Sequence, residues 1–155
     1  MKPITKFAAI FLIACLACVS CKKNKDNRTA KTKTELLTVA PWKRTALIST
    51  PAYDWNADGT FATDILTTMW SCEKDNLDIY KTNGVIETNE GATKCNPSDP
   101  QSWTAIWVFA VNETKLIFDG TDEYIIVELT ETTLKFQSTF VENGVTYTHV
   151  ETYGH

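Results

Sequence analysis

The chain has few of the residues and motifs on which catalysis usually depends. Only two of its 155 residues are histidine, His149 and the terminal His155. No serine lies in a nucleophile-elbow context, and no glycine-rich loop suited to a phosphate is present. Carboxylates that meet only in the folded chain could still form a glycosidase pair. We nevertheless expect a protein that is not an enzyme.

The chain also lacks an apolar run long enough to cross a bilayer as a helix. The longest, residues 7–19, has thirteen uncharged residues, whereas a membrane-spanning helix needs about 20. It follows the basic residues Lys2 and Lys6 and ends among small side chains. A basic start, a short apolar core and small residues at its end are typical of a secretory signal. We therefore expect residues 1–20 to be a signal peptide.

Cysteine is unevenly distributed along the chain. Three of the five cysteines, Cys15, Cys18 and Cys21, lie within seven residues at the end of the apolar run. A cysteine at this boundary resembles the lipobox of bacterial lipoproteins, in which the signal is cut before the cysteine and that residue is acylated. Cys15 follows the more usual lipobox, but cleavage there would leave two spare thiols in an oxidising compartment. We predict that acyl chains on Cys21 anchor the protein to a membrane, with Cys15 as the alternative.

Basic side chains do not dominate the exported part of the chain. Once Lys2 and Lys6 are removed, 13 basic side chains stand against 19 acidic ones, which gives a formal charge of −6. This charge does not favour nucleic-acid binding. Residues 22–34 contain one apolar residue and cannot offset the entropy of ordering. We expect residues 21–34 to be a flexible tether and residues 35–155 to be one folded domain.

The pattern of the folded part is typical of antiparallel strands joined by tight turns. Asn83 and Gly84, between two apolar runs, form a strong hairpin signal. Further turn residues follow about every 8–12 residues. This spacing predicts an all-β fold, an antiparallel meander barrel of about eight strands. Residues 64–71 are the exception, because their apolar side chains have helical spacing and Asp64 or Thr63 can cap them. We expect a short helix there that plugs one end of the barrel.

Alternating apolar side chains indicate which residues face the barrel interior. Large aromatic side chains favour a filled barrel, whereas small residues such as Ala105 and Ser138 favour a hollow one. The same pattern serves a solid core more often than a ligand cavity. If the barrel is hollow, we expect its cavity to be lined by Trp107, Phe109, Phe118, Ile125, Val127, Leu134 and Phe136.

Cys72 and Cys95 are the two cysteines of the folded part. In an exported protein the default for such a pair is a disulfide. Their segments flank one expected hairpin, so the two residues can meet. A zinc site would want four ligands, and a catalytic thiol would leave the other cysteine unexplained. We predict a disulfide.

Residues 54–59, with the sequence DWNADG, have oxygen-bearing side chains at the first, third and fifth positions and glycine at the sixth. This is the first half of a calcium-binding loop, in which alternate side chains turn inward and the glycine permits a sharp bend. The glutamate expected at the twelfth position is replaced by Ile65. We predict weak calcium binding, with a solvated turn as the alternative. The residues that would bind calcium are Asp54, Asn56, Asp58 and Asp64.

Four segments of the folded part carry a further signal. They are LLTVAPW at 36–42, WSCEKDN at 70–76, EGATKCNPSDP at 90–100 and WVFAVNETKL at 107–116. Together they resemble the lipocalin-like domain of Gram-negative outer-membrane lipoproteins, over about residues 35–153. The resemblance implies a small barrel that can hold a small apolar ligand, on a lipoprotein of the outer membrane. The alternative is a structural or protein-interaction module of the cell envelope whose barrel is filled.

Overall fold

The computed structural model describes residues 30–155, so the predicted signal peptide and the lipidation site Cys21 lie outside the described residues. The strands in chain order are β1 (Trp42–Tyr53), β2 (Ala62–Asp64), β3 (Leu77–Tyr80), β4 (Val85–Asn89), β5 (Ser102–Ala110), β6 (Lys115–Phe118), β7 (Asp122–Leu129), β8 (Leu134–Glu142) and β9 (Val145–Gly154). The helical elements are α1 (Lys33–Leu37) and the 3₁₀ turn η1 (Ile65–Thr67). No helix among residues 30–155 is both long and apolar enough to span a membrane.

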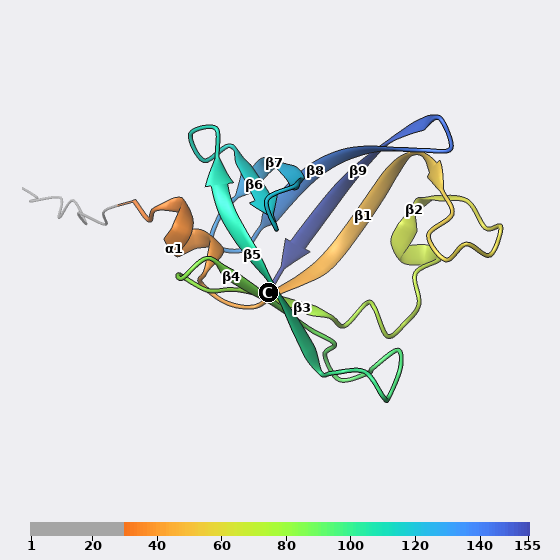
Figure 1. Cartoon of the computed structure of the whole chain (residues 1–155), viewed down its shortest axis with the longest axis horizontal. Helices are drawn as coiled ribbons and strands as arrows, with labels where there is room; N and C mark the ends of the chain where they lie inside the picture. The colour runs from red at the N-terminus through yellow and green to blue at the C-terminus, as the bar shows by residue number, and fades with distance from the viewer. Residues whose placement is uncertain (1–29) are drawn as a thin grey trace, which may run out of the picture.

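The strands form one antiparallel sheet that closes on itself (Figure 1). Their order is β2-β1-β3-β4-β5-β6-β7-β8-β9, and a further pairing joins β1 to β9. Eight strands therefore form a closed barrel, and β2 is an extra strand beside β1. Closure leaves the eight strands without a free edge. The all-β antiparallel meander barrel predicted from the sequence is confirmed.

Left-handed backbone at the tight turns sets the register of two hairpins. Asn143 and Gly144 have φ values of 50° and 78° between β8 and β9. This is the backbone that a two-residue hairpin loop prefers, and the residues on either side, Glu142 and Val145, pair directly. At the predicted hairpin between β3 and β4, Gly84 has a φ of 81°. The Asn-Gly signals in the sequence thus mark the turns as expected.

The end of the barrel next to α1 is closed by packed side chains. α1 begins at Lys33, two residues before the predicted domain boundary, because Thr32 and Glu35 form a reciprocal capping box. The indole nitrogen of Trp42 donates a 2.7 Å hydrogen bond to the carbonyl of Leu37 in α1. Both side chains are fully buried in one apolar cluster. α1, rather than residues 64–71, therefore plugs an end of the barrel.

The helix predicted at residues 64–71 is wrong in extent, because the chain forms only the single turn η1. Asp64 caps this turn by accepting a hydrogen bond from the Leu66 N–H. The hydroxyls of Thr67 and Thr68 bond back to the carbonyls of Asp64 and Ile65. Such local bonds compete with a continuing helix. The apolar residues of the segment instead pack against the side of β1 at Leu47.

Candidate binding site

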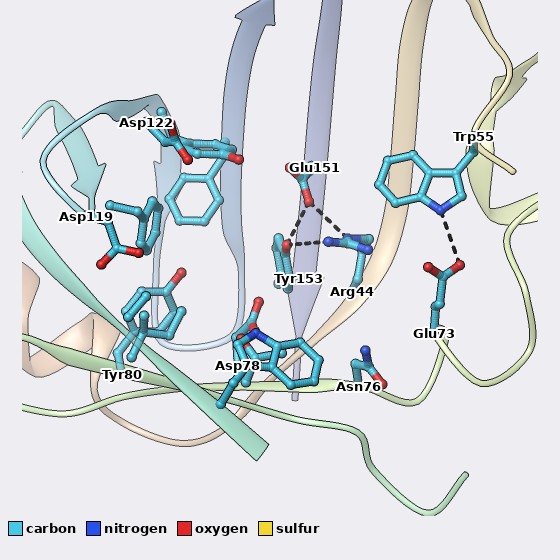
Figure 2. Close-up of a pocket in the computed structure, with 17 residues that line it drawn as sticks. Arg44, Trp55, Glu73, Asn76, Asp78, Tyr80, Asp119, Asp122, Glu151 and Tyr153 are labelled. Carbon is cyan, nitrogen blue, oxygen red and sulfur yellow. Dashed lines mark hydrogen bonds and ion pairs between the residues drawn. The ribbon is translucent and has the colours of Figure 1, made fainter. Parts of the chain in front are cut away.

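A cavity of about 410 Å³ lies inside the barrel (Figure 2). Each strand of the eight-stranded circuit contributes at least one lining side chain, so the cavity lies on the barrel axis. Its volume is within the range of small-molecule sites, about 300–1,000 Å³. The aromatic residues that line it are Trp55, Tyr80, Trp103, Phe118, Tyr124, Phe136 and Tyr153. The barrel is therefore partly hollow.

The seven residues predicted to line a cavity fall into three groups. Phe118 and Phe136 line the cavity. Trp107 and Leu134 are buried in the solid cluster at the closed end, and Phe109 packs against that cluster. The remaining two, on β7, lie on the outer face of the barrel.

Ile125 and Val127 are the two incorrect cavity residues, with exposed fractions of 45% and 52%. Tyr124 and Ile126 face inward instead and pack against the core cluster. β7 is apolar on both faces, so alternation alone could not choose between them. A register shift between Ile126 and Glu128 then interrupts the alternation. As a result Leu129, and not Glu128, packs against the core.

A charged cluster spans the interior wall where β1 meets β9. The Arg44 Nε donates a 2.9 Å hydrogen bond to Glu151 Oε2, which also accepts one of 2.7 Å from the Tyr153 hydroxyl. Arg44 Nη2 donates to the same hydroxyl at 3.1 Å. Burial opposes the charge of Arg44, but Tyr153 and Glu151 raise its pKa above the ordinary value. The guanidinium thus stays charged and is held by Glu151.

A second carboxylate, Asp78 on β3, faces the same cavity. The Thr88 hydroxyl donates a 2.7 Å hydrogen bond to it. Burial raises the pKa of Asp78, and the hydrogen bond from Thr88 and the charge of Arg44 only partly oppose this. Burial also raises the pKa of the nearby Tyr124 to about 12, so this hydroxyl stays protonated. Asp78 is a half-buried carboxylate, and none of the ion pairs among the described residues includes it.

A second hollow of about 410 Å³ continues from the cavity along β1, β8 and β9. The two spaces share the lining residues Arg44, Trp55, Tyr124 and Glu151. His149 lines this second hollow and is only 6% exposed. Its Nε2 has no hydrogen-bond partner in the part of the chain that the structure describes. The ring lies among the aromatic side chains of Tyr53, Trp55 and Phe140.

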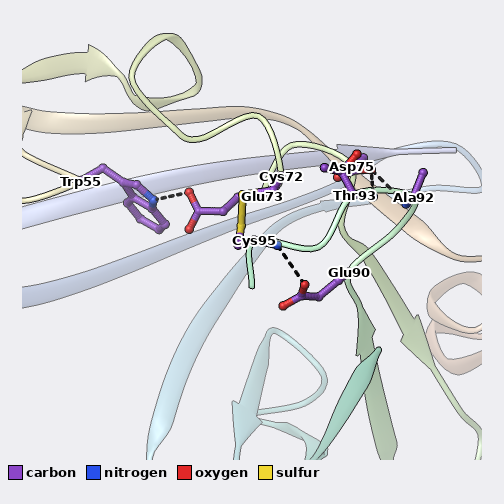
Figure 3. The surroundings of a disulfide bond; sticks show 8 residues. All are labelled: Trp55, Cys72, Glu73, Asp75, Glu90, Ala92, Thr93 and Cys95. Carbon is purple, nitrogen blue, oxygen red and sulfur yellow. Dashed lines mark hydrogen bonds between the residues drawn. A yellow bond between two sulfur atoms is a disulfide. The ribbon is translucent and has the colours of Figure 1, made fainter. Parts of the chain in front are cut away.

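Two loops at the open end of the barrel are fixed to each other (Figure 3). The predicted disulfide between Cys72 and Cys95 is present, with Cα atoms 5.1 Å apart. The carboxylate of Asp75 accepts 2.9 Å hydrogen bonds from the N–H groups of Ala92 and Thr93. Gly91 has a φ of 65°, and a Cβ there would lie 2.3 Å from the Asp75 carbonyl oxygen. Close packing of the two backbones therefore requires glycine at this position.

Trp55 connects the disulfide-linked loops to the wall of the cavity. Its indole nitrogen donates a 3.2 Å hydrogen bond to Glu73, the neighbour of Cys72. Both residues line the cavity, as does Asn76 a few residues further on. On the opposite side of the opening, Asp119 lies in the turn between β6 and β7, and Asp122 is the first residue of β7 (Figure 2). The opening thus has aromatic and acidic side chains around it.

The predicted calcium loop is held by its own hydrogen bonds. The Asp54 carboxylate accepts from the N–H groups of Asp58 and Gly59, at 3.1 and 2.8 Å. Asn56 donates to the Thr68 carbonyl, and Asp64 caps η1. No group of three or more His, Cys, Asp or Glu among the described residues is placed to hold a metal ion. The structure therefore does not bring the four residues together, and calcium binding stays a prediction.

The interior charges were missed from the sequence, although a signal for them exists. Asp78 is two residues from the inward Tyr80, and Arg44 is two residues from the inward Trp42. A charged residue at an inward position of a strand is expensive unless it is paired or has a function. Comparison of the sequence with models of protein families and with curated proteins finds no match. The case for a function therefore rests on the fold and the cavity.

Proposed function

We propose that this protein is a membrane-anchored lipoprotein whose barrel binds one small, largely apolar molecule. The observation that carries the proposal is the interior cavity of about 410 Å³, with lining residues from all eight strands of the closed barrel. Eight strands is the number at which a barrel either just fills or holds one small ligand. Here the end next to α1 is filled and the other end is hollow. A binding site fits this arrangement better than a solid interaction module does.

The disulfide-linked loops support a binding role. They are fixed to each other at the open end by the disulfide and by Asp75. A ligand that enters past Trp55 would meet a wall that is already in place. Sites of this kind are largely preformed, which limits the entropy lost on binding. The alternative of a filled envelope module leaves the cavity without a role.

Binding can be tested with N-phenyl-1-naphthylamine, a neutral fluorescent probe. We expect saturable binding at one site per chain. Ala105 lines the cavity, so Ala105→Trp should fill the space and abolish binding. The matched control is Thr104→Trp, whose position is exposed and adjacent. Equal loss in both variants, or no saturable binding by the native protein, would remove the proposal.

Anchoring is tested separately from ligand binding. Expression of the full chain in a Gram-negative host should place it in the membrane fraction, with an acylated N-terminal peptide that begins at Cys21. Cys21→Ser should then release the protein, whereas Cys15→Ser should leave it anchored. Release by Cys15→Ser alone would move the lipidation site to Cys15. Release by neither variant would remove the anchor from the proposal.

A further inference from the structure

The charges around the cavity are strongly unequal. Among the described residues that line it, one guanidinium stands against five carboxylates. The carboxylates are Glu73, Asp78, Asp119, Asp122 and Glu151. A concave site with low-dielectric walls concentrates the field of such charges. Asp119 and Asp122 are exposed at the opening, so the cavity and its mouth together have an excess of negative charge.

Arg44 is not free to receive an anionic ligand. Its Nε is paired with Glu151 at 2.9 Å, and its guanidinium carbon lies 5.5 and 5.9 Å from the ring centres of Tyr153 and Trp55. Its Nη2 donates a 3.1 Å hydrogen bond to the Tyr153 hydroxyl, and its Nη1 lies 3.9 Å from the sulfur of Met69. The cation is thus neutralised and stacked within the wall. An incoming anion would have to displace Glu151 and would also face Asp78.

Two buried polar atoms beside the cavity lack a partner among the described residues. They are Nε2 of His149, a residue that is only 6% exposed, and Oδ1 of Asn76. Buried polar atoms of this kind are normally satisfied by protein or water. His149 lines the second hollow and Asn76 lines the first. Oδ1 of Asn76 can only accept a hydrogen bond, and Asp78 adds a carboxylate, so the cavity has acceptors that its own donors leave open.

We propose that the ligand is an organic cation, a protonated amine carried on an aromatic or apolar body, with its ammonium group directed at Asp78. The inference rests on the proposed function, because it assigns a ligand class to the same cavity. The ammonium group supplies both the positive charge and the hydrogen-bond donors that the wall lacks. The aromatic rings of Tyr80, Tyr124 and Phe136 also line the cavity and can add cation–π attraction. The apolar body then occupies the space beside Phe118.

Three probes with one ring system separate charge from shape. They are 1-naphthylmethylammonium, neutral 1-naphthylmethanol and anionic 1-naphthoate, each titrated by quenching of tryptophan fluorescence. The ammonium should bind about tenfold or more tightly than the alcohol, because one such charge pair readily exceeds 1.4 kcal/mol. The anion should bind more weakly than the alcohol. The ammonium preference should also decrease with added salt.

Asp78→Asn should reduce ammonium affinity to near that of the alcohol and leave the alcohol unchanged. The variant keeps an acceptor for Thr88 and removes a half-buried charge, so it should stay folded, which thermal melting checks. Glu128→Gln is the matched control, because Glu128 is exposed on β7 and does not line the cavity. If all three probes bind alike, or if Asp78→Asn weakens the alcohol equally, the cation inference is wrong while ligand binding stands. If none binds, both proposals fail.

Discussion

The two halves of the barrel interior have the same alternation of side chains but opposite contents. Next to α1, the inward positions hold Trp42, Tyr80, Trp107, Leu134 and Tyr153, all buried. Tyr80 and Tyr153 form the boundary with the cavity, because they also line it. Two residues further along the same strands, toward the open end, the inward positions hold Arg44, Asp78, Ala105, Phe136 and Glu151. On four of the five strands, the next inward position toward the open end therefore holds a small or charged side chain in place of a large one.

This difference shows that the direction in which a side chain points and the filling of the interior are decided separately. The period of two decides which side chains point inward. The size and charge of those side chains decide whether the interior is solid. A solid half supplies most of the burial, and the other half can then keep a cavity and an ionised cluster. Stability and ligand binding are thus assigned to opposite ends of one barrel.

The largest effect should come from truncating a side chain of the solid half. Trp107 is 5% exposed, contacts the rings of Tyr80 and Phe109, and donates a hydrogen bond to the Val85 carbonyl. Trp107→Ala should lower the free energy of unfolding by about 4 kcal/mol, the usual cost of such a cavity. Phe118→Ala, beside an existing cavity, should cost about half as much. Urea denaturation measures both, and equal losses would contradict a division into solid and hollow halves.

The second effect concerns the disulfide that fixes the open end. Cys72 and Cys95 are 23 positions apart, so a double serine variant should lose about 3 kcal/mol on the chain-entropy model. The closed end does not depend on this link, so the variant should remain folded. We expect proteolysis of the native state to become faster only within residues 54–76 and 90–101. Cleavage that begins instead in β7 or β8 would show that the open end is not the weaker half.

The fold was largely predictable because its signals are local. Asn-Gly turns and apolar alternation predict an antiparallel meander barrel of about eight strands, which is the observed architecture. The helix predicted at 64–71 was too long, because the chain forms only the turn η1 and the hydroxyls of Thr67 and Thr68 bond back to it. The outward Ile125 and Val127 were wrong because β7 is apolar on both faces. Closure through the pairing of β1 with β9 depends on contacts about a hundred residues apart, which no local pattern encodes.

The site was less predictable, because its charges come from separate strands. Asp78 and Glu151 are each surrounded in sequence by ordinary strand residues, and they meet only when the barrel closes. The disulfide was predictable from the cysteine count and the expectation of export. The unpaired acceptors of the interior were not predictable, because the sequence does not show which charged side chains become paired. Arg44 finds Glu151, whereas Asp78 is left with the Thr88 hydroxyl.

A smaller effect is expected from breaking the ion pair of the hollow half. Arg44→Met should lower the free energy of unfolding by about 2 kcal/mol, because it leaves Glu151 without its cation in a partly buried site. The double variant Arg44→Met with Glu151→Gln should recover most of this loss, since the amide oxygen can still accept from Tyr153. Thermal and urea unfolding measure both variants. Failure of the second substitution to restore stability would mean that Arg44 acts through packing instead of through its charge.

The smallest effect should appear in the pH dependence of stability. Burial lowers the pKa of His149, the charge of Arg44 adds to this, and Glu151 only partly opposes it. An unfolded histidine has a pKa of about 6.5. As the pH falls through this value, the unfolded chain takes up a proton before the folded one does. The free energy of unfolding should therefore fall with acidification, starting near pH 6.5 and ending at the lower pKa of the folded state.

His149→Phe isolates this contribution, since its position lies among Tyr53, Trp55 and Phe140 and the new ring does not titrate. Asp78 acts with the opposite sign, because its raised pKa lets the folded chain take up a proton first as the pH falls. Subtracting the variant from the native protein at each pH cancels that effect. The difference should change between neutral pH and pH 5 and should persist in a His155→Gln background. A difference that is constant with pH would mean that His149 is as easily protonated in the folded hollow as in the unfolded chain.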